Sequence, residues 1–224
     1  WVLTEEAGLR TALDQWPVGY GEWGGKRPSV QSEKFEPKRT DPETVLKLLD
    51  WLRLPDGERP RFLMLYFRGA DKVGHTEGPD SPELKARLKE IDAVLGGLVD
   101  SVRALPNAAD ISLLFVTDHG MVEVKKMINL DALWDREKLT GKYVTSGPVA
   151  NVFEPDAAKQ DKILAALATV PELKAWRAAD LPTEFRYRHA RSGDIVALAN
   201  EGNMFKDSAK GRDVIYTAKE PRGM

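Results

Sequence analysis

Two apolar runs separated by one long periodic segment constrain the fold of this chain more than any other feature. The runs cover residues 62–67 and 111–116, and both have the composition of a β-strand. The second is apolar at nearly every position, as in a central strand buried on both faces. Along residues 82–105, leucines and other apolar residues recur at alternating spacings of four and three, which predicts an amphipathic helix. A strand–helix–strand unit almost always forms a parallel pair, so we expect an α/β fold. In it, helices would cover both faces of a largely parallel sheet.

An acidic–histidine motif directly follows each of these apolar runs. The first motif is Asp71-Lys72-Val73-Gly74-His75, and the second is Asp118-His119-Gly120-Met121. The carboxyl ends of neighbouring parallel strands meet at one edge of a sheet, which is where ligands bind in open α/β folds. We therefore expect four side chains to converge there: Asp71, His75, Asp118 and His119. A solvated turn capped by aspartate is the alternative for either motif alone.

The residue types in these motifs favour a metal site with oxygen and nitrogen ligands. The chain has no cysteine, which excludes disulfides and thiolate ligands. Aspartate and histidine without cysteine suit zinc, or another divalent first-row metal, better than calcium. Two ligand pairs predict two ions, which in such sites lie about 3.5–4 Å apart and act on phosphoryl groups. Four ligands are too few for two closed sites, so further ligands are required.

The composition of the chain gives no reason to expect a nucleic acid or a membrane as its binding partner. The formal net charge is -2, which gives no electrostatic reason to expect binding to nucleic acid or to an anionic membrane. No apolar run approaches the roughly 20 residues that a membrane span needs. A small-molecule substrate is the remaining expectation. Trp23 and Phe35, in a long loop over residues 17–40, are weak candidates for stacking on it, and packing anchors are the alternative. His189 lies in a basic segment and is interpreted as part of a solvated strand.

The remaining pattern predicts further elements and a division into subdomains. Apolar spacing predicts a first helix from Thr4 to Trp16 and a second over residues 41–52. Beyond Met121, short helices alternate with half-polar strands, which is typical of an α+β subdomain. We expect helices over 130–139 and 156–169, and strands over 149–153, 173–177, 186–189 and 195–199. The expected division is a metal-binding core over 1–124, an α+β cap over 125–205, and a return to the core over 206–224.

The chain resembles the nucleotide pyrophosphatase/phosphodiesterase (type I phosphodiesterase) family of the alkaline phosphatase superfamily. The resemblance rests first on residues 66–79 and 117–121, which contain the two motifs. Weaker matches run in the family's order along essentially the whole chain: residues 1–17, 51–55, 147–149 and 191–196. The segment Trp16-Pro17-Val18-Gly19 departs from the family, which usually has glycine directly after the Trp-Pro pair.

The resemblance implies an alkaline phosphatase-like core and two zinc ions. Asp71 and His75 would hold one ion, Asp118 and His119 would hold the other, and His189 would not be a ligand. In the family, an upstream segment supplies another aspartate, a Thr or Ser nucleophile and an Asn, none of which maps onto this chain. A further histidine ligand would follow Gly223-Met224. We therefore expect a segment of a longer protein that is inactive alone and, by the resemblance, periplasmic or secreted.

The function that the resemblance implies is zinc-dependent hydrolysis of phosphodiester or pyrophosphate bonds. Nucleotides would be the substrates, and a covalent phospho-Thr/Ser intermediate would form on a residue outside this chain. One alternative is a sister activity: phosphomonoesterase, phosphonoacetate hydrolase or lysophospholipid phosphodiesterase. A non-catalytic metal-binding domain is the alternative from another class.

Overall fold

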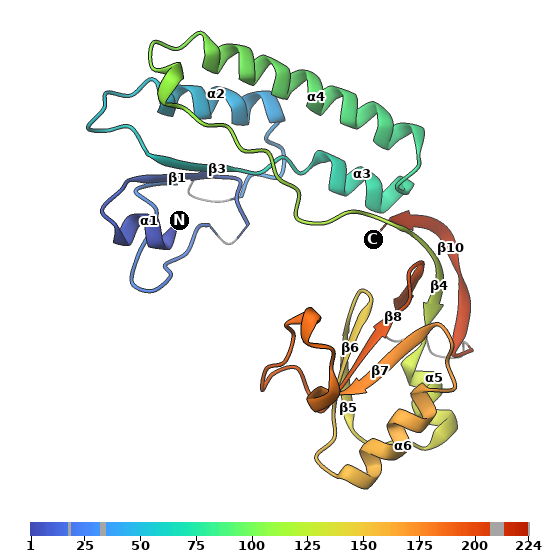
Figure 1. Cartoon of the computed structure of the whole chain (residues 1–224). Coiled ribbons are helices and arrows are strands. Elements are labelled where there is room, and N and C mark those ends of the chain that lie inside the picture. Colours follow the sequence, from blue (N-terminus) through green and yellow to red (C-terminus); the bar gives the residue numbers. More distant parts are fainter. Residues whose placement is uncertain (18, 32–34, 207–212, 224) are drawn as a thin grey trace. The chain divides into compact units, whose positions relative to one another are not determined.

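The computed structural model describes residues 1–17, 19–31, 35–206 and 213–223 and divides into two compact units. Unit 1 comprises Trp1–Val73 and Asp80–Asp118, and unit 2 comprises Gly74–Pro79 and His119–Met224. Figure 1 labels most of the helices and strands of both units. The subdomain boundaries expected from the sequence stay a prediction. Val18 and Met224, which belong to segments used for the family resemblance, lie outside the described residues.

Unit 1 is built on a three-stranded parallel sheet with the order β2-β1-β3. Its strands are β1 (Thr11–Asp14), β2 (Val30–Gln31) and β3 (Phe62–Leu65), and its complete helices are α1 (Val2–Glu6), α2 (Asp41–Leu52) and α4 (Pro82–Arg103). Figure 1 shows α2 and α4 side by side next to this sheet. Their facing apolar side chains form the core of the unit: Val45, Leu48, Leu49, Leu52, Leu98 and Val102. A 3₁₀ turn, Ala108–Asp110, follows α4.

Local sequence fixes where the two long helices begin. Thr40 and Glu43 form a reciprocal capping box at the start of α2, and Ser81 caps α4. A proline follows each cap, where its fixed backbone angle suits the first helical turn. Both helices lie where they were expected.

Unit 2 combines two sheets with two helices. A four-stranded antiparallel sheet has the order β5-β6-β8-β7, and a mixed sheet has the order β10-β4-β9. The strands are β4 (Glu123–Ile128), β5 (Lys142–Ser146), β6 (Val149–Phe153), β7 (Leu173–Arg177), β8 (Ile195–Ala199), β9 (Asn203–Phe205) and β10 (Ile215–Gly223). The helices are α5 (Leu130–Glu137) and α6 (Ala157–Leu167), with 3₁₀ turns at Ala178–Asp180 and Thr183–Phe185. Ile128, Val152, Leu167 and Ile195 lie in their shared core.

The predicted α/β class is confirmed, and so is the mixture of helices and short strands beyond Met121. The strands expected over 149–153, 173–177 and 195–199 are present as β6, β7 and β8. In the described part of the chain, none of the helices combines the length and the apolar character that a membrane crossing requires.

The first predicted helix is wrong over most of its length. Helix α1 stops at Glu6, and Gly8 follows with a positive φ of 77°. Residues Thr11–Asp14 then form β1, whose four side chains are all buried. The helical spacing of apolar residues here was misleading, because a central strand buried on both faces accepts the same side chains.

Two other predicted strands are also wrong. Residues 111–116 run as irregular chain, and their side chains include Leu114 at 85% exposure and Val116 at 74%. No strand in the described structure pairs with this run, so its strand propensity is not realised. Residues 186–189 are also irregular and follow the 3₁₀ turn at Thr183–Phe185. An apolar or β-prone composition indicates a preference for extended chain, whereas a strand also requires a hydrogen-bonded neighbour.

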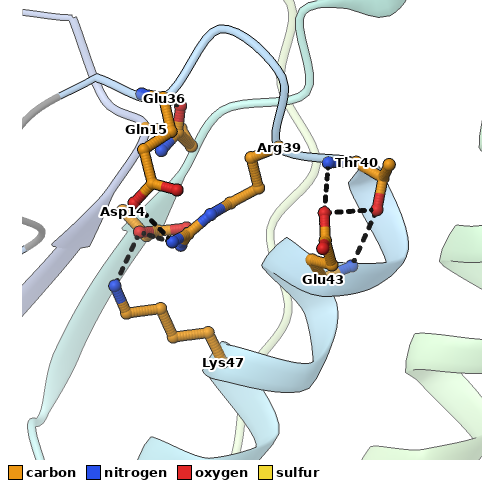
Figure 2. Close-up of polar contacts among 7 residues, drawn as sticks. All are labelled: Asp14, Gln15, Glu36, Arg39, Thr40, Glu43 and Lys47. Atoms are coloured by element: carbon orange, nitrogen blue, oxygen red, sulfur yellow. Dashed lines mark hydrogen bonds and ion pairs between the residues drawn. The ribbon is translucent and has the colours of Figure 1, made fainter.

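A buried carboxylate ties three segments of unit 1 together (Figure 2). Asp14 ends β1 with a side chain that has no solvent exposure. Arg39 Nη1 donates to its two oxygens at 2.9 and 3.1 Å, and Lys47 Nζ donates at 3.1 Å. Arg39 also pairs with Glu36 at 2.6 Å, and the Glu36 backbone N–H donates to Gln15 Oε1 at 3.1 Å. The cluster thus holds the end of the long loop and helix α2 against β1.

Replacing Asp14 with asparagine tests the strength of this cluster. Asp14→Asn keeps the shape of the side chain but leaves Arg39 and Lys47 without their shared buried anion. We expect the free energy of unfolding in urea to fall by about 3 kcal/mol. Asp50→Asn is the matched control, because Asp50 pairs with Arg53 at 74% side-chain exposure. That change should cost no more than about 0.5 kcal/mol. Equal effects of the two substitutions would contradict a structural role for Asp14.

A second carboxylate makes the stability of unit 1 depend on pH. Glu5 accepts hydrogen bonds from the backbone N–H and hydroxyl of Thr11 and of Ser29. Partial burial by itself raises the pKa of Glu5, but these hydrogen bonds outweigh it and hold the pKa below the usual 4.5. The resulting stabilisation is complete above about pH 4.5 and disappears as the pH falls through the lower folded-state pKa.

Comparing Glu5→Gln with the parent protein at several pH values tests this linkage. The stability difference between the two, measured by urea unfolding, should be largest at neutral pH and should shrink below pH 4.5. Glu6→Gln is the control, since the neighbouring Glu6 side chain is exposed. A Glu5→Gln difference that stays constant down to acidic pH would show that these hydrogen bonds do not favour the ionised form.

Candidate metal centre

The first acidic–histidine motif lies on a helix rather than in the loop expected from the sequence. Helix α3 spans Gly69–Glu77, so Asp71 and His75 are four residues apart on one element. Residues at this spacing lie on the same face of an α-helix. Arg87 of α4 covers the start of α3 so closely that a Cβ at position 69 would overlap its guanidinium. Gly69 therefore lets the Arg87 guanidinium lie directly against the α3 backbone.

The aspartates of both motifs act on the same phenol in unit 1. Burial raises the pKa of Tyr66, and the carboxylates of Asp71 and Asp118 raise it further, against a smaller opposing effect of Arg68. A charge raises a phenol's pKa appreciably only at short range, because water and salt screen it at longer distances. Asp71 and Asp118, separated by helix α4 in the sequence, thus both lie close enough to Tyr66 to act on its phenol. The convergence of all four motif side chains stays a prediction.

The two motif histidines of unit 2 share one hydrogen-bonding arrangement. His75 Nδ1 lies 2.7 Å from the carbonyl oxygen of Gly223, and His119 Nδ1 lies 2.8 Å from that of Gly120. A carbonyl oxygen only accepts, so Nδ1 carries the proton in both rings. The lone pair is then on Nε2, the nitrogen through which either ring would bind a metal. Imidazoles that bind metals almost always donate their other N–H to a carbonyl or carboxylate in this way.

Gly223 is the point at which the two motifs meet in unit 2. A Cβ built on Gly223 would overlap the carbonyl oxygen of Gly74 and the Sδ and Cγ atoms of Met121. Gly74 belongs to the first motif and Met121 to the second, so the last residue of β10 is in tight contact with both. Within unit 2, the backbone of the first motif and the side chain of Met121 therefore come together at one residue.

The full set of metal ligands stays a prediction. Among the residues that the structure describes, no three His, Asp or Glu side chains are grouped closely enough to hold a metal ion. Asp71 and Asp118 belong to unit 1, whereas His75 and His119 belong to unit 2.

The other residues singled out from the sequence have simpler surroundings. The Arg68 guanidinium lies 5.2 Å from the ring centroid of Phe35, which gives that ring a cation–π partner within the chain. Trp23 is half exposed, and its backbone bridges to Lys26. His189 is exposed and its Nδ1 accepts from the backbone N–H of Arg191. Whether Trp23 or Phe35 contacts a substrate stays a prediction.

Comparison with known proteins identifies the family to which this chain belongs. The sequence profile described as "Type I phosphodiesterase / nucleotide pyrophosphatase" matches residues 1–224. The chain belongs to this family. The resemblance seen in the sequence is thereby confirmed.

Two relatives are about one third identical to this chain over the aligned residues. An uncharacterised pyrophosphatase/phosphodiesterase of Schizosaccharomyces pombe is 35% identical over 145 residues, which is 61% of this chain and 30% of that protein. Human ectonucleotide pyrophosphatase/phosphodiesterase family member 1 is 33% identical over 164 residues, which is 70% of this chain and 17% of that protein. The chain thus spans less than a third of the length of either relative.

A solved structure confirms the fold of this family member. Mouse ectonucleotide pyrophosphatase/phosphodiesterase 5, as an inactive variant in complex with AMP, matches with a TM-score of 0.78 at 24% identity. The match covers 100% of this chain and 61% of that one.

Sequence reasoning missed two residues of the candidate centre. Tyr66 is the next-to-last residue of the first apolar run, and its polar tip could have been noticed as a partner for the aspartates. Gly223 contributes a backbone carbonyl, which leaves no side-chain signal in the sequence.

Removing one motif aspartate tests the pairing around Tyr66. In the metal-free protein, Asp118→Asn should lower the pKa of Tyr66, because one of the two carboxylates that raise it is neutralised. Tyrosine ring signals followed by NMR through an alkaline titration would measure the change. Asp92→Asn is the control, because Asp92 is an exposed residue of α4, and this substitution should leave the pKa of Tyr66 unchanged. An unchanged Tyr66 pKa in Asp118→Asn would show that the second motif lies away from this phenol.

Proposed function

We propose that the protein is a zinc-dependent hydrolase of phosphodiester or pyrophosphate bonds in nucleotide substrates. Membership of the type I phosphodiesterase family supports the reaction class. The AMP bound to the mouse relative supports a nucleotide as the substrate. The observation that carries the metal dependence is the shared geometry of His75 and His119, each with its Nδ1 on a carbonyl oxygen. Such geometry is the normal environment of a histidine ligand.

The donor set fits two zinc ions held by both motifs. Asp71 and His75 would hold one ion, and Asp118 and His119 would hold the other, with further ligands needed to complete each site. Oxygen and nitrogen donors without cysteine are suitable for zinc in a catalytic site. When bound, zinc would supply positive charge to the phosphate oxygens and lower the pKa of the attacking group. The chain's own contribution is to hold each imidazole by a hydrogen bond from its Nδ1–H to a backbone carbonyl.

We further propose that the reaction proceeds through a covalent phospho-Thr or phospho-Ser intermediate. The mouse relative in complex with AMP is an inactive threonine-to-alanine variant, which supports a threonine as an essential residue in that protein. We assign the nucleophile to no residue among these 224. A nucleophilic hydroxyl splits the displacement at phosphorus into two in-line steps, each assisted by an adjacent activating group.

An extracellular or secreted location fits this assignment. The relatives include ectonucleotide enzymes and the venom phosphodiesterases of Macrovipera lebetinus and Crotalus adamanteus. Their names support the same location for this protein as part of the proposal.

Hydrolysis by two histidine variants tests the proposed function. In the purified full-length protein that contains this chain, His75→Ala should lower the rate on a chromogenic nucleotide diester by about 100-fold or more, because one ion loses a ligand. His189→Ala is the matched control, since His189 is exposed and lies outside both motifs. It should keep the parent rate. A chelator should abolish the activity and added zinc should restore it.

The same assay separates the alternatives. A faster rate on a phosphomonoester than on the nucleotide diester would replace this proposal with a sister activity of the superfamily. Bound zinc without hydrolysis of either substrate would indicate a non-catalytic metal-binding domain. Equal rates in His75→Ala and His189→Ala would contradict the metal role of the first motif.

A further inference from the structure

We propose that Gly223 is a positioning residue for His75. Its carbonyl oxygen fixes the imidazole tautomer that presents Nε2, and its missing side chain lets the carbonyl come close enough to do so. The inference rests on the proposed function in one respect, because it assigns His75 as a metal ligand. Its structural part, the control of the tautomer, stands on the contacts of Gly223 alone.

The hydrogen bond determines which ring nitrogen carries the proton. A neutral imidazole has two tautomers, with the proton on Nδ1 or on Nε2. The 2.7 Å contact between His75 Nδ1 and the Gly223 oxygen admits only the Nδ1–H form, because two acceptors facing each other at that distance would repel. The ring is therefore held with its Nε2 lone pair directed away from β10.

The absence of a side chain at position 223 is required by its neighbours. A Cβ there would overlap the carbonyl oxygen of Gly74, a backbone atom that cannot rotate away. Gly74 directly precedes His75 in α3. Any side chain at position 223 would therefore push the end of β10 away from the same helical turn that carries the imidazole. The close approach and the hydrogen bond thus depend on the same glycine.

Strand pairing holds this carbonyl in a position that is also linked to the second motif. β10 pairs with β4 in antiparallel register, with Gly223 opposite Glu123. β4 begins two residues after Met121, whose side chain packs against Gly223. A register shift between Thr217 and Arg222 precedes this last pair and changes the path of β10 just before it reaches α3. The Gly223 carbonyl is thus placed by the strand that directly continues the second motif.

An ordinary packing role for Gly223 makes different predictions. If the glycine served only to end β10 compactly, replacing it would lower stability without any specific effect on His75. A positioning role requires that the tautomer of His75 and its affinity for zinc change while the fold persists. The tautomer of the His75 imidazole is thus the measurement that distinguishes a positioning role of Gly223 from a packing role.

Nitrogen-15 NMR of the histidine rings in the zinc-free protein tests the proposal. The chain has three histidines, so single His→Gln variants assign their signals. At a pH where the ring is neutral, His75 in the parent protein should be in the Nδ1–H form. Gly223→Ala should shift His75 toward a mixture of tautomers and weaken zinc binding about 10-fold or more, as loss of a partner to a ligand does. Gly57→Ala is the control, because a Cβ at Gly57 would have no atom within 4 Å.

Each outcome decides the proposal. Nδ1–H in the parent protein, lost in Gly223→Ala and kept in Gly57→Ala, supports it. An Nε2–H tautomer of His75 in the parent protein overturns it. This measurement is made on the parent protein, so it does not depend on whether a variant folds. A folded Gly223→Ala protein that keeps both the tautomer and the parent zinc affinity also overturns it. If the tautomer responds as expected but zinc binds neither protein, Gly223 still positions the ring and the proposed metal dependence fails.

Discussion

The candidate centre depends on a hydrogen bond between an imidazole and a backbone carbonyl that are 148 residues apart, those of His75 and Gly223. It selects the tautomer of a candidate ligand, and it requires β10 to approach α3 without a side chain between them. The same strand end also contacts Met121, so the two sequence motifs share one backbone anchor. A histidine in a loose loop would present either nitrogen. In this protein the hydrogen bond to Gly223 keeps the proton on Nδ1 of His75, so Nε2 is the unprotonated nitrogen even without a metal.

Carboxylates in unit 1 have two different roles. Asp14 is completely buried, and Arg39 and Lys47 compensate its charge, so this aspartate stabilises the junction of β1, the long loop and α2. Asp71 and Asp118 instead raise the pKa of Tyr66 together with burial. β1 and β3 end on the same edge of the parallel sheet, so Asp14 and the first motif both follow neighbouring strand ends.

Sequence patterns that depend only on nearby residues, such as helix periods and caps, predicted their elements well. Patterns whose outcome depends on a pairing partner far along the chain did not. The apolar periods of α2 and α4 and the start of α4 at Ser81 are encoded within a few residues, and these helices lie as predicted. The run at 111–116 has strand composition, but composition does not supply a pairing partner, and Leu114 is exposed. β4 and β5 were missed because their half-polar sequences carry no strong alternation. The four candidate ligands were found from sequence because they are side chains of recognisable chemistry. The Gly223 carbonyl could not be, since a backbone acceptor is the same at every residue.

The most direct test of the central claim is a crystal structure of the zinc-soaked protein with anomalous scattering measured at the zinc edge. We predict two zinc ions about 3.5–4 Å apart. Asp71 and His75 would coordinate one ion, and Asp118 and His119 the other, with both imidazoles bound through Nε2. Zinc bound through Nδ1 of His75, or located away from either motif, would contradict it.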